Sequence, residues 1–407
     1  LMPLLYVNVQ KILNHCHKCI VLVLFFNLVI FLLSIQAFFY KIKRFKYYMI
    51  KIALVGCGRI AKRHSDLLGG EQIEGASLVS VCDINHNKAL SIGDKYNVPA
   101  YFDMDKMMSS EKIDMVVVLT PSGLHAEHVV NLSKYGKHIM VEKPMALTLN
   151  DADSMISACD QSNCKLFVIK QNRFNLPVTK LRESIESNRF GKLVLGTVRV
   201  RWARHQHYYD QDEWRGTWAM DGGVLTNQAS HHVDMLEWMM GDIESVFAKS
   251  TTALVDIEAE DTAVVTLKFR NGALGIIEAT TATRPKDLEG SISILGEKGS
   301  VVISGFAVNK MQTWLFEDKK PGDEDILEKY SVNPPNVYGY GHQAYYEHVV
   351  NCLSSGGQNL VDGLQGRKSI ELISAIYESV ETGKEVFLHF KPKRCKLGQR
   401  KIENIEQ

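Results

Sequence analysis

The sequence predicts an α/β protein in which a doubly wound parallel sheet is followed by an α+β domain with a large, mostly antiparallel open sheet. Its 407 residues exceed the usual size of one domain. From 49 to 171, short apolar runs alternate with helical patterns, which is typical of a parallel sheet covered on both faces. From 172 to 390, apolar and polar residues alternate between turn signals such as "RNG" and "GEKG", which indicates antiparallel strands.

The expected elements follow in order along the chain. In the first domain we expect strands at 50–55, 76–83, 113–120 and 137–143, and helices from near 59, at 86–95 and at 123–135. In the second domain we expect strands at 192–204, 244–254, 261–283, 291–304 and 310–316, and helices at 224–240, 341–354 and 363–382. The polar, basic tail 391–407 is expected to fray.

Composition excludes several classes of protein. Apolar residues make up 45% and charged residues 23%, as in ordinary globular proteins. Residues 1–48 hold six Lys and Arg and no acid, so the rest of the chain has 41 Lys and Arg against 46 Asp and Glu. This mildly acidic body argues against a nucleic-acid binder. The eight scattered cysteines form no disulfide or zinc pattern, so we expect a reducing, cytoplasmic location and no metal site.

The segment 19–40 contains 22 residues without a charge and precedes the basic cluster "KIKRFK". It is long enough to span a bilayer and would leave the body on the cytoplasmic side. A competing interpretation is that 1–48 is non-native upstream translation, because the chain begins with Leu1 and Met49 directly precedes a domain start. We favour Met49 as the start, and expect contact with a membrane only if 19–40 is native.

A dinucleotide fingerprint follows the first expected strand. Gly56 permits a tight turn, Gly58 lets the backbone approach a pyrophosphate, and Ala61 allows close packing of the helix on the strand. The helix N-terminus offers unpaired N–H groups to the phosphates. Asp83 ends the second strand, where an acid accepts hydrogen bonds from the adenosine ribose and repels a 2′-phosphate. The cofactor is therefore predicted to be NAD.

Further cofactor contacts are expected at the helix start and at the carboxyl ends of the strands, because ligands of open α/β sheets lie in that crevice. The sequence leaves open whether His125 faces the nicotinamide or caps the following helix. The additional residues expected to bind NAD are Arg59, Ile60, Thr120, Pro121, Ser122, His125, Glu142, Lys143 and Gln171.

Catalytic candidates come from two places. Lys143 in "VEKP" ends the fourth strand, where a lysine can donate to a substrate oxygen. In "GGVLTNQASHHVD", 222–234, a helix would put Asn227 and His231 on one face, and histidine can accept a hydroxyl proton at neutral pH. We expect Asn227 to orient His231 or the substrate, and expect structural roles for His232 and Asp234.

The motifs "GCGRIA", "TPSGLHAEHV", "VEKPMALT" and "GGVLTNQASHHVD", in this order, resemble the glucose–fructose oxidoreductase, inositol dehydrogenase and rhizopine catabolism family of NAD(P)-dependent enzymes. The resemblance covers about 49–390 and implies a Rossmann domain followed by an α/β domain whose open sheet often serves oligomerisation. It matches the catalytic lysine of the family to Lys143 and the catalytic histidine to His231. Many members have an aspartate where this chain has Asn227.

Within the family, the stretch 201–242 looks most like the dehydrogenases that oxidise C3 of UDP-N-acetylglucosaminuronic acid for surface polysaccharides such as lipopolysaccharide. This resemblance implies a homo-oligomer, perhaps a tetramer, with 2-oxoglutarate as a possible oxidant of NADH. A UDP-uronate needs cationic and aromatic neighbours. The residues expected near the substrate, besides the three catalytic candidates, are Lys170, Asn172, Arg173, Arg204, Tyr208, Tyr209, Trp214, Arg215, Thr217, Tyr338, Tyr340 and His342.

Two other functions remain open from the sequence. A member of the same family that acts on a polyol such as inositol, or on another keto-sugar, would show the same motifs. A catalytically silent NAD-binding regulator is conceivable because Asn227 cannot act as a base.

Overall fold

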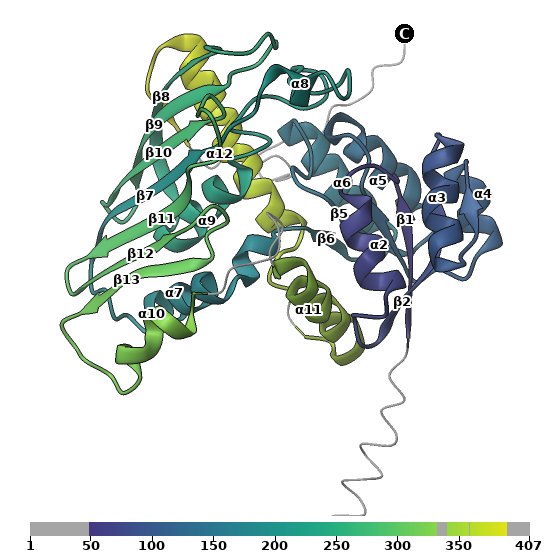
Figure 1. Ribbon diagram of the computed structural model, residues 1–407, viewed down its shortest axis with the longest axis horizontal. Helices are drawn as coiled ribbons and strands as arrows, with labels where there is room; N and C mark the ends of the chain where they lie inside the picture. Colours follow the sequence, from purple (N-terminus) through teal and green to yellow (C-terminus); the bar gives the residue numbers. More distant parts are fainter. Residues whose placement is uncertain (1–48, 332–339, 358, 389–407) are drawn as a thin grey trace, which may run out of the picture. The chain divides into compact units, whose positions relative to one another are not determined.

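The first sheet contains six strands that run in parallel. In the computed structural model, which describes residues 49–331, 340–357 and 359–388, its order is β3-β2-β1-β4-β5-β6 (Figure 1). The strands are β1 (Ile50–Val55), β2 (Ala76–Cys82), β3 (Ala100–Tyr101), β4 (Met115–Val118), β5 (His138–Val141) and β6 (Leu166–Val168). The predicted doubly wound parallel sheet is thereby confirmed.

The strands of this sheet are apolar because helices cover them. All four residues of β4 are buried, as a strand packed on both faces requires. The helices of this part are α2 (Ala61–Gly69), α3 (His86–Tyr96), α4 (Met104–Ser110), α5 (His125–Ser133) and α6 (Leu149–Gln161). Side-chain caps fix where three of them begin: Asn85 accepts from Lys88 N–H, Asp103 from Lys106 N–H and Thr148 from Asp151 N–H.

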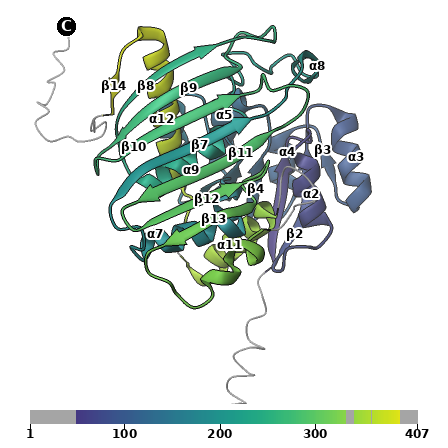
Figure 2. The ribbon, with the colours of Figure 1, turned by 60° about the vertical axis from the view of Figure 1, so that its left-hand side comes forward.

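The second sheet has eight strands in the order β13-β12-β11-β7-β10-β9-β8-β14 (Figure 2). The strands are β7 (Leu193–Arg201), β8 (Ile243–Thr251), β9 (Thr262–Phe269), β10 (Leu274–Thr280), β11 (Glu289–Gly296), β12 (Gly299–Ser304), β13 (Lys310–Phe316) and β14 (Val386–Phe387). All neighbours pair antiparallel except β7 and β10, which are parallel. The mostly antiparallel open sheet is confirmed.

Burial alternates along the strands of the second sheet. In β10, Gly275 and Ile277 are buried, whereas Leu274 and Ile276 are exposed. The remaining helices are α7 (Leu176–Glu186), α8 (Gln206–Tyr209), α9 (Ser230–Met240), α10 (Ile326–Lys329), α11 (Gly341–Ser355) and α12 (Gly363–Thr382), with 3-10 turns at Ser122–Leu124, Gln171–Phe174 and Asp323–Asp325. The sheet packs on α9 and α12, and Figure 2 shows no described helix over the face turned to the viewer.

Two helices late in the chain, α11 and α12, pack against the first sheet, and α12 also contacts the second. Tyr345 and Tyr346 of α11 are fully buried in the core of the parallel sheet. In α12, Gly366 lies so close to Val168 of β6 that a Cβ would stand 2.6 Å from its side chain. Figure 1 shows both helices, in yellow-green, between the two sheets. The chain after the second sheet therefore returns to complete the first core, which the linear pattern of the sequence does not indicate.

In the part of the chain that the structure describes, no helix is long and apolar enough to cross a membrane. Three predictions fall on residues outside that part: the apolar segment 19–40, the tail 391–407 and the substrate contact at Tyr338.

Candidate active site

The turn after β1 has the geometry of a phosphate cradle. Gly56 has φ +97°, and a Cβ there would stand 2.8 Å from the backbone of Leu119, so glycine is required on both counts. Nothing lies within 4 Å of a Cβ built on Gly58, so the space above this residue is open to a ligand. Ala61 begins α2 and is fully buried. These residues fit a bound pyrophosphate.

Asp83 fixes this turn to the end of β2. Its two carboxylate oxygens accept from the backbone N–H groups of Cys57 and Asn85, each at 2.7 Å. A carboxylate offers about four acceptor positions, so capacity remains for ribose hydroxyls. Arg59 beside the turn is exposed and Ile60 is half-buried. The arrangement fits NAD, which when bound supplies or accepts a hydride.

The ends of β4 and β5 are tied together by His125. One ring nitrogen lies 2.8 Å from the carbonyl oxygen of Thr120, and the other lies 2.8 Å from that of Pro144. The Thr120 hydroxyl contacts His128 at 2.9 Å, while Pro121 is half-buried and Ser122 is buried. His125 thus fixes the backbone of the predicted cofactor edge, and its nicotinamide contact remains a prediction.

Glu142 lies in a buried polar cluster. Its Oε1 lies 3.1 Å from Nε2 of His64 and 3.5 Å from Nε2 of His342, and its Oε2 accepts from Lys143 N–H. His64 also contacts the Tyr346 hydroxyl at 2.7 Å. Burial raises the pKa of Glu142, but the hydrogen bonds of His342 and His64 hold it well below its ordinary value. The cluster joins α2, the end of β5 and α11 directly beside Lys143 in the chain.

Lys143 reaches from the first sheet to the loop before α9. Its Nζ donates to the carbonyl oxygen of Asn227 at 2.9 Å. Burial lowers the pKa of Lys143, whereas the charges of Glu142 and Asp221 raise it. A protonated amine in this position can donate to an oxygen of a bound substrate.

Asn227 precedes α9, the helix that carries His231. The prediction of a helix from 224 is wrong, because α9 begins only at Ser230 and residues 224–228 form turns. The argument that Asn227 and His231 share a helical face is therefore wrong as well. The Asn227 amide donates instead to Asp221 Oδ1 at 2.6 Å.

His231 lies in the first turn of α9 with 8% of its surface exposed. The amide nitrogen of Gln171 lies 2.9 Å from its Nε2. Burial, and next the charge of Lys143, lower the pKa of His231 well below 6.5. The imidazole is therefore neutral at pH 7, with Nε2 accepting from the Gln171 amide, so a substrate hydroxyl has to displace this contact before Nε2 can take a proton.

Two predicted substrate contacts lie in a different buried network. Arg173 binds both oxygens of Asp234 at 2.8 Å, and Lys170 lies 3.1 Å from Oδ1 of the same carboxylate. The Ser369 hydroxyl of α12 also donates to Asp234. Burial raises the pKa of Asp234, but the charges of Arg173 and Lys170 hold it far below its ordinary value. Asn172 beside them is half-buried.

His232 follows His231 and packs against a different neighbour, Trp202. It is fully buried, its ring stands edge-on to Trp202, and burial lowers its pKa to about 3. The histidine is thus neutral and packed in the interior.

The loop between β7 and α9 stacks arginines on aromatic rings. The Arg204 guanidinium lies 5.5 Å from the ring centre of Tyr208 and pairs with Asp287 at 2.9 Å. The Arg215 guanidinium lies 4.8 Å from Tyr208 and 4.6 Å from Trp214. These half-buried side chains come from one loop, as expected of a binding segment.

The other residues predicted to contact substrate differ in their exposure and partners. The Tyr209 hydroxyl is buried 3.1 Å from that of Thr281, and burial raises its pKa to about 12. Thr217 donates to the carbonyl oxygen of Trp214. His342 is buried on Glu142, and Tyr340 is 52% exposed.

Sequence reasoning missed two residues of this region. Asp221 precedes the glycine pair and contacts Asn227, and the signal that could have found it is a lone acid beside a catalytic motif. His64 lies three residues after Ala61, but its partner Tyr346 is 282 positions away, so no local pattern indicates the contact.

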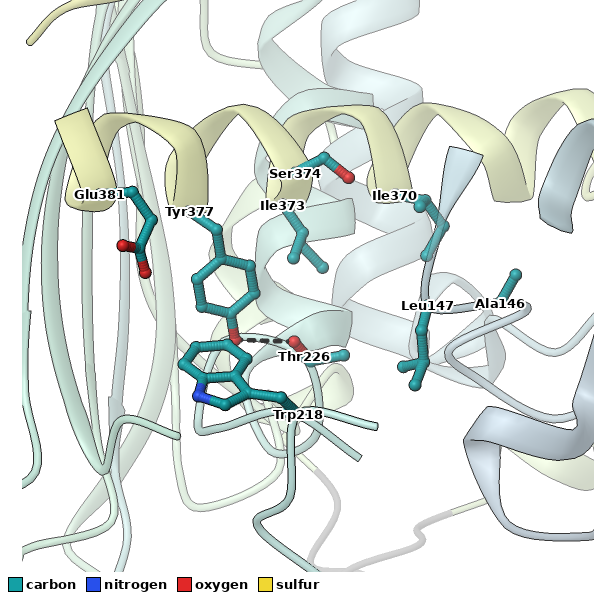
Figure 3. A pocket seen from close by; sticks show the side chains of 10 residues that line it. Ala146, Leu147, Trp218, Thr226, Ile370, Ile373, Ser374, Tyr377 and Glu381 are labelled. Carbon is teal, nitrogen blue, oxygen red and sulfur yellow. Dashed lines mark hydrogen bonds between the residues drawn. The ribbon is translucent and has the colours of Figure 1, made fainter. Parts of the chain in front are cut away.

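A pocket of about 390 Å³ lies beside the loop that carries Asn227 (Figure 3). The Tyr377 hydroxyl of α12 contacts the Thr226 hydroxyl at 2.8 Å on its wall. The lining residues are Ala146, Leu147, Trp218, Gly222, Thr226, Ile370, Ile373, Ser374, Tyr377 and Glu381. None of the predicted catalytic residues lines this pocket.

Comparison with known proteins gives two solved structures of high similarity. The WlbA dehydrogenase from Bordetella pertussis, in complex with NADH and UDP-GlcNAcA, is 41% identical, covers 84% of this chain and 98% of its own, and has a TM-score of 0.80. The WlbA dehydrogenase from Chromobacterium violaceum, with the same ligands, is 40% identical, covers 85% and 97%, and has a TM-score of 0.79. A myo-inositol 2-dehydrogenase from Thermotoga maritima is 28% identical over 83% of this chain and 98% of its own.

Family models match both parts of the chain. Residues 50–170 match the NAD-binding Rossmann fold of an oxidoreductase family, and residues 182–388 match the C-terminal alpha/beta domain of the same family. Since these matches agree with the glycine turn, the two sheets and the placement of Lys143 beside the loop before α9, the chain belongs to the glucose–fructose oxidoreductase, inositol dehydrogenase and rhizopine catabolism (Gfo/Idh/MocA) family and is an NAD-binding oxidoreductase.

Proposed function

We propose that this protein oxidises the C3 hydroxyl of UDP-N-acetylglucosaminuronic acid with NAD⁺. The observation that carries the proposal is the 41% identity, over 84% of the chain, to a dehydrogenase solved with NADH and UDP-GlcNAcA. The meeting of Lys143 and the His231 helix at the carboxyl edge of the first sheet supports the same chemistry.

His231 is the base of the proposed reaction. Its neutral imidazole takes the proton of the sugar hydroxyl. Lys143 donates a hydrogen bond to the same oxygen and stabilises the negative charge that develops there. NAD⁺ takes the hydride from C3, so the products are a 3-keto sugar, NADH and a proton. Asn227 holds Lys143 through its backbone carbonyl oxygen, while its side-chain amide donates to Asp221.

The arginines of the β7–α9 loop are proposed to bind the anionic parts of the substrate. Arg204 and Arg215 lie in one aromatic cluster with Tyr208, and guanidinium groups suit phosphate and carboxylate oxygens. Asp287 and Asp212 hold these guanidinium groups by ion pairs at 2.9 and 3.0 Å. An anionic ligand would compete with those carboxylates, so its binding is expected to weaken at high salt.

We further propose a cytoplasmic homo-oligomer, and a tetramer as its form. The open face of the second sheet supports assembly, because Val264, Leu274 and Ile276 are exposed there between charged side chains. By family resemblance, 2-oxoglutarate is the proposed oxidant of the NADH, and the product is proposed to enter the synthesis of a surface polysaccharide. Light scattering would test the tetramer, and loss of NADH absorbance on adding 2-oxoglutarate would test the oxidant.

A substrate panel tests the main proposal. Purified protein is incubated with NAD⁺ and UDP-GlcNAcA, and NADH formation is followed at 340 nm, with 2-oxoglutarate present in a parallel series. UDP-GlcNAc, which lacks the carboxylate, is the matched control and should react far more slowly. Mass spectrometry of the product should show the loss of two hydrogen atoms. Turnover of UDP-GlcNAc at the same rate would overturn the assignment of a uronate.

The second candidate is a polyol dehydrogenase, which the 28% identity to a myo-inositol 2-dehydrogenase favours. The same panel includes myo-inositol. A strong preference for inositol over every UDP-sugar would replace the main proposal with this one.

A further inference from the structure

We propose that Asp221 is a positioning residue of the catalytic site: its buried carboxylate orients the Asn227 amide and supplies negative charge beside Lys143. The inference rests on the proposed function only in taking the protonated lysine to donate a hydrogen bond to the substrate. Asp221 lies outside the motif that indicated the site.

The Asp221 carboxylate is fixed before any ligand binds. Its residue is 1% exposed, and its Oδ2 accepts from the backbone N–H of Gly216 at 2.9 Å. The backbone N–H of Asp221 donates to the carbonyl oxygen of Thr217 at 3.1 Å. A buried carboxylate held on both sides in this way has little freedom to turn, so its second oxygen sets the position of its neighbour.

That neighbour is the side chain of Asn227. An ionised carboxylate only accepts hydrogen bonds, so the contact at 2.6 Å requires the NH₂ end of the amide to face Asp221. The amide oxygen then points the other way, and it makes no hydrogen bond with any residue that the structure describes. Asp221 therefore turns Asn227 into an acceptor for a substrate N–H or O–H group.

The same pair also affects Lys143. The lysine donates to the carbonyl oxygen of Asn227, so a shift of this residue moves the ammonium group as well. Two carboxylates, Glu142 and Asp221, favour the charged form of the lysine. Burial, and the charges of Lys170 and Arg215, oppose it. His231 is neutral and adds no charge. Removing the Asp221 charge thus favours loss of the proton from Lys143.

Exchanging the two partners gives a direct test. Asp221→Asn keeps the shape but removes the charge. Asn227→Asp puts two carboxylates in a contact of 2.6 Å, where they must share a proton. The double exchange D221N/N227D restores one acid and one amide with donor and acceptor reversed. It also keeps a negative charge near Lys143 and an acceptor facing the substrate.

We expect kcat of D221N to fall about 10- to 100-fold, the loss typical of a misplaced catalytic group. The basic limb of its pH profile should move to lower pH. N227D should lose activity as pH rises through the ionisation of the shared proton, and the double exchange should recover most of kcat and the original basic limb. Binding of NADH, measured by fluorescence, and the thermal midpoint should stay near those of the unchanged protein in D221N and in the double exchange, whereas the paired carboxylates of N227D should lower the thermal midpoint as pH rises.

A second readout needs no substrate. The reaction of Lys143 with acetic anhydride, followed across pH by peptide mass spectrometry, reports its deprotonated fraction. D221N should react at lower pH, and the double exchange should return the curve to its original position. If wild type fails with UDP-GlcNAcA while this titration behaves as stated, the proposed substrate is wrong and the role of Asp221 stands. An unchanged titration in D221N, or a double exchange no more active than either single variant, would overturn the inference.

Discussion

Two polar networks, one on α9 around Asp234 and one at the loop before α9 around Lys143, differ in how completely their charges are paired. In the Asp234 network, the carboxylate is bound by Arg173, Lys170 and Ser369, all from the protein itself. In the Lys143 network, the ammonium group donates to one acceptor among the described residues, the carbonyl oxygen of Asn227, and it can donate two more hydrogen bonds. The comparison indicates that a buried charge whose partners all come from the protein stabilises the fold, whereas a charge with unused hydrogen-bond donors is available to bind a ligand.

The largest effect is expected from breaking the paired network. Asp234→Ala leaves two buried cations without their carboxylate, and should lower the free energy of unfolding by about 3–5 kcal/mol. Urea unfolding measures this loss. Asp234→Asn, which keeps the shape and one acceptor, should cost less. A loss under 1 kcal/mol in D234A would contradict the structural role given to this network.

For Lys143, the second-largest effect, we expect a loss of activity without a loss of stability. Lys143→Met removes a donor but leaves no carboxylate unpaired in the way D234A leaves cations, so we expect kcat to fall about 100- to 1,000-fold. The free energy of unfolding should stay the same or rise, because a buried ammonium costs free energy. Lys170→Met is the matched control, because it removes the same ammonium group from the Asp234 network. Its main effect should be a loss of free energy of unfolding and not a loss of kcat. Equal losses of free energy of unfolding in Lys143→Met and Lys170→Met would contradict the distinction between the two networks.

The third prediction concerns pH. Because His231 has a pKa well below 6.5 and acts when neutral, kcat should stay constant from pH 7.5 down through 6.5 and fall only at lower pH. Since the unfolded chain binds that proton near pH 6.5, the same shift should make folding stability decline as pH falls below 6.5. A kcat profile and urea midpoints across pH 5–8 measure both. An acid limb centred at 6.5 or above would mean that the base is more exposed than the structure shows.

The fold was largely predictable because its signals are local. The glycine turn, the apolar runs and the alternation in 192–204 each depend on residues close in sequence. What the sequence did not reveal depends on distant contacts. The return of α11 into the first core places Tyr346 on His64, and no periodicity records a contact between residues 282 positions apart.

The site was predicted less completely for the same reason. Lys143 lies where its strand end indicated, beside the loop that leads into the His231 helix. Lys170 and Arg173 follow another strand end and have the right chemistry for a substrate anion, yet Asp234 pairs with both. Lys143 and the pair Lys170 and Arg173 look alike in sequence, and only the tertiary contacts show which cations already have a carboxylate partner. Asn227 was placed on a helix because its spacing allowed one, but the turns at 224–228 delay the start of α9 to Ser230.

The smallest effect is expected at Tyr209, where a substitution distinguishes a structural role from a role in substrate binding. Tyr209 belongs to the loop that carries Arg204 and Arg215, but its hydroxyl is buried on Thr281, as in the paired network. Tyr209→Phe should therefore lower the free energy of unfolding by about 1 kcal/mol and leave KM for the sugar unchanged. Tyr208→Phe is the companion variant, because the Tyr208 hydroxyl accepts from Arg215 at 3.1 Å and its loss should move KM. A higher KM in Y209F with an unchanged free energy of unfolding would mean that the hydroxyl turns toward the ligand on binding. In that case, burial in the ligand-free structure would not be enough to assign a residue of this loop a purely structural role.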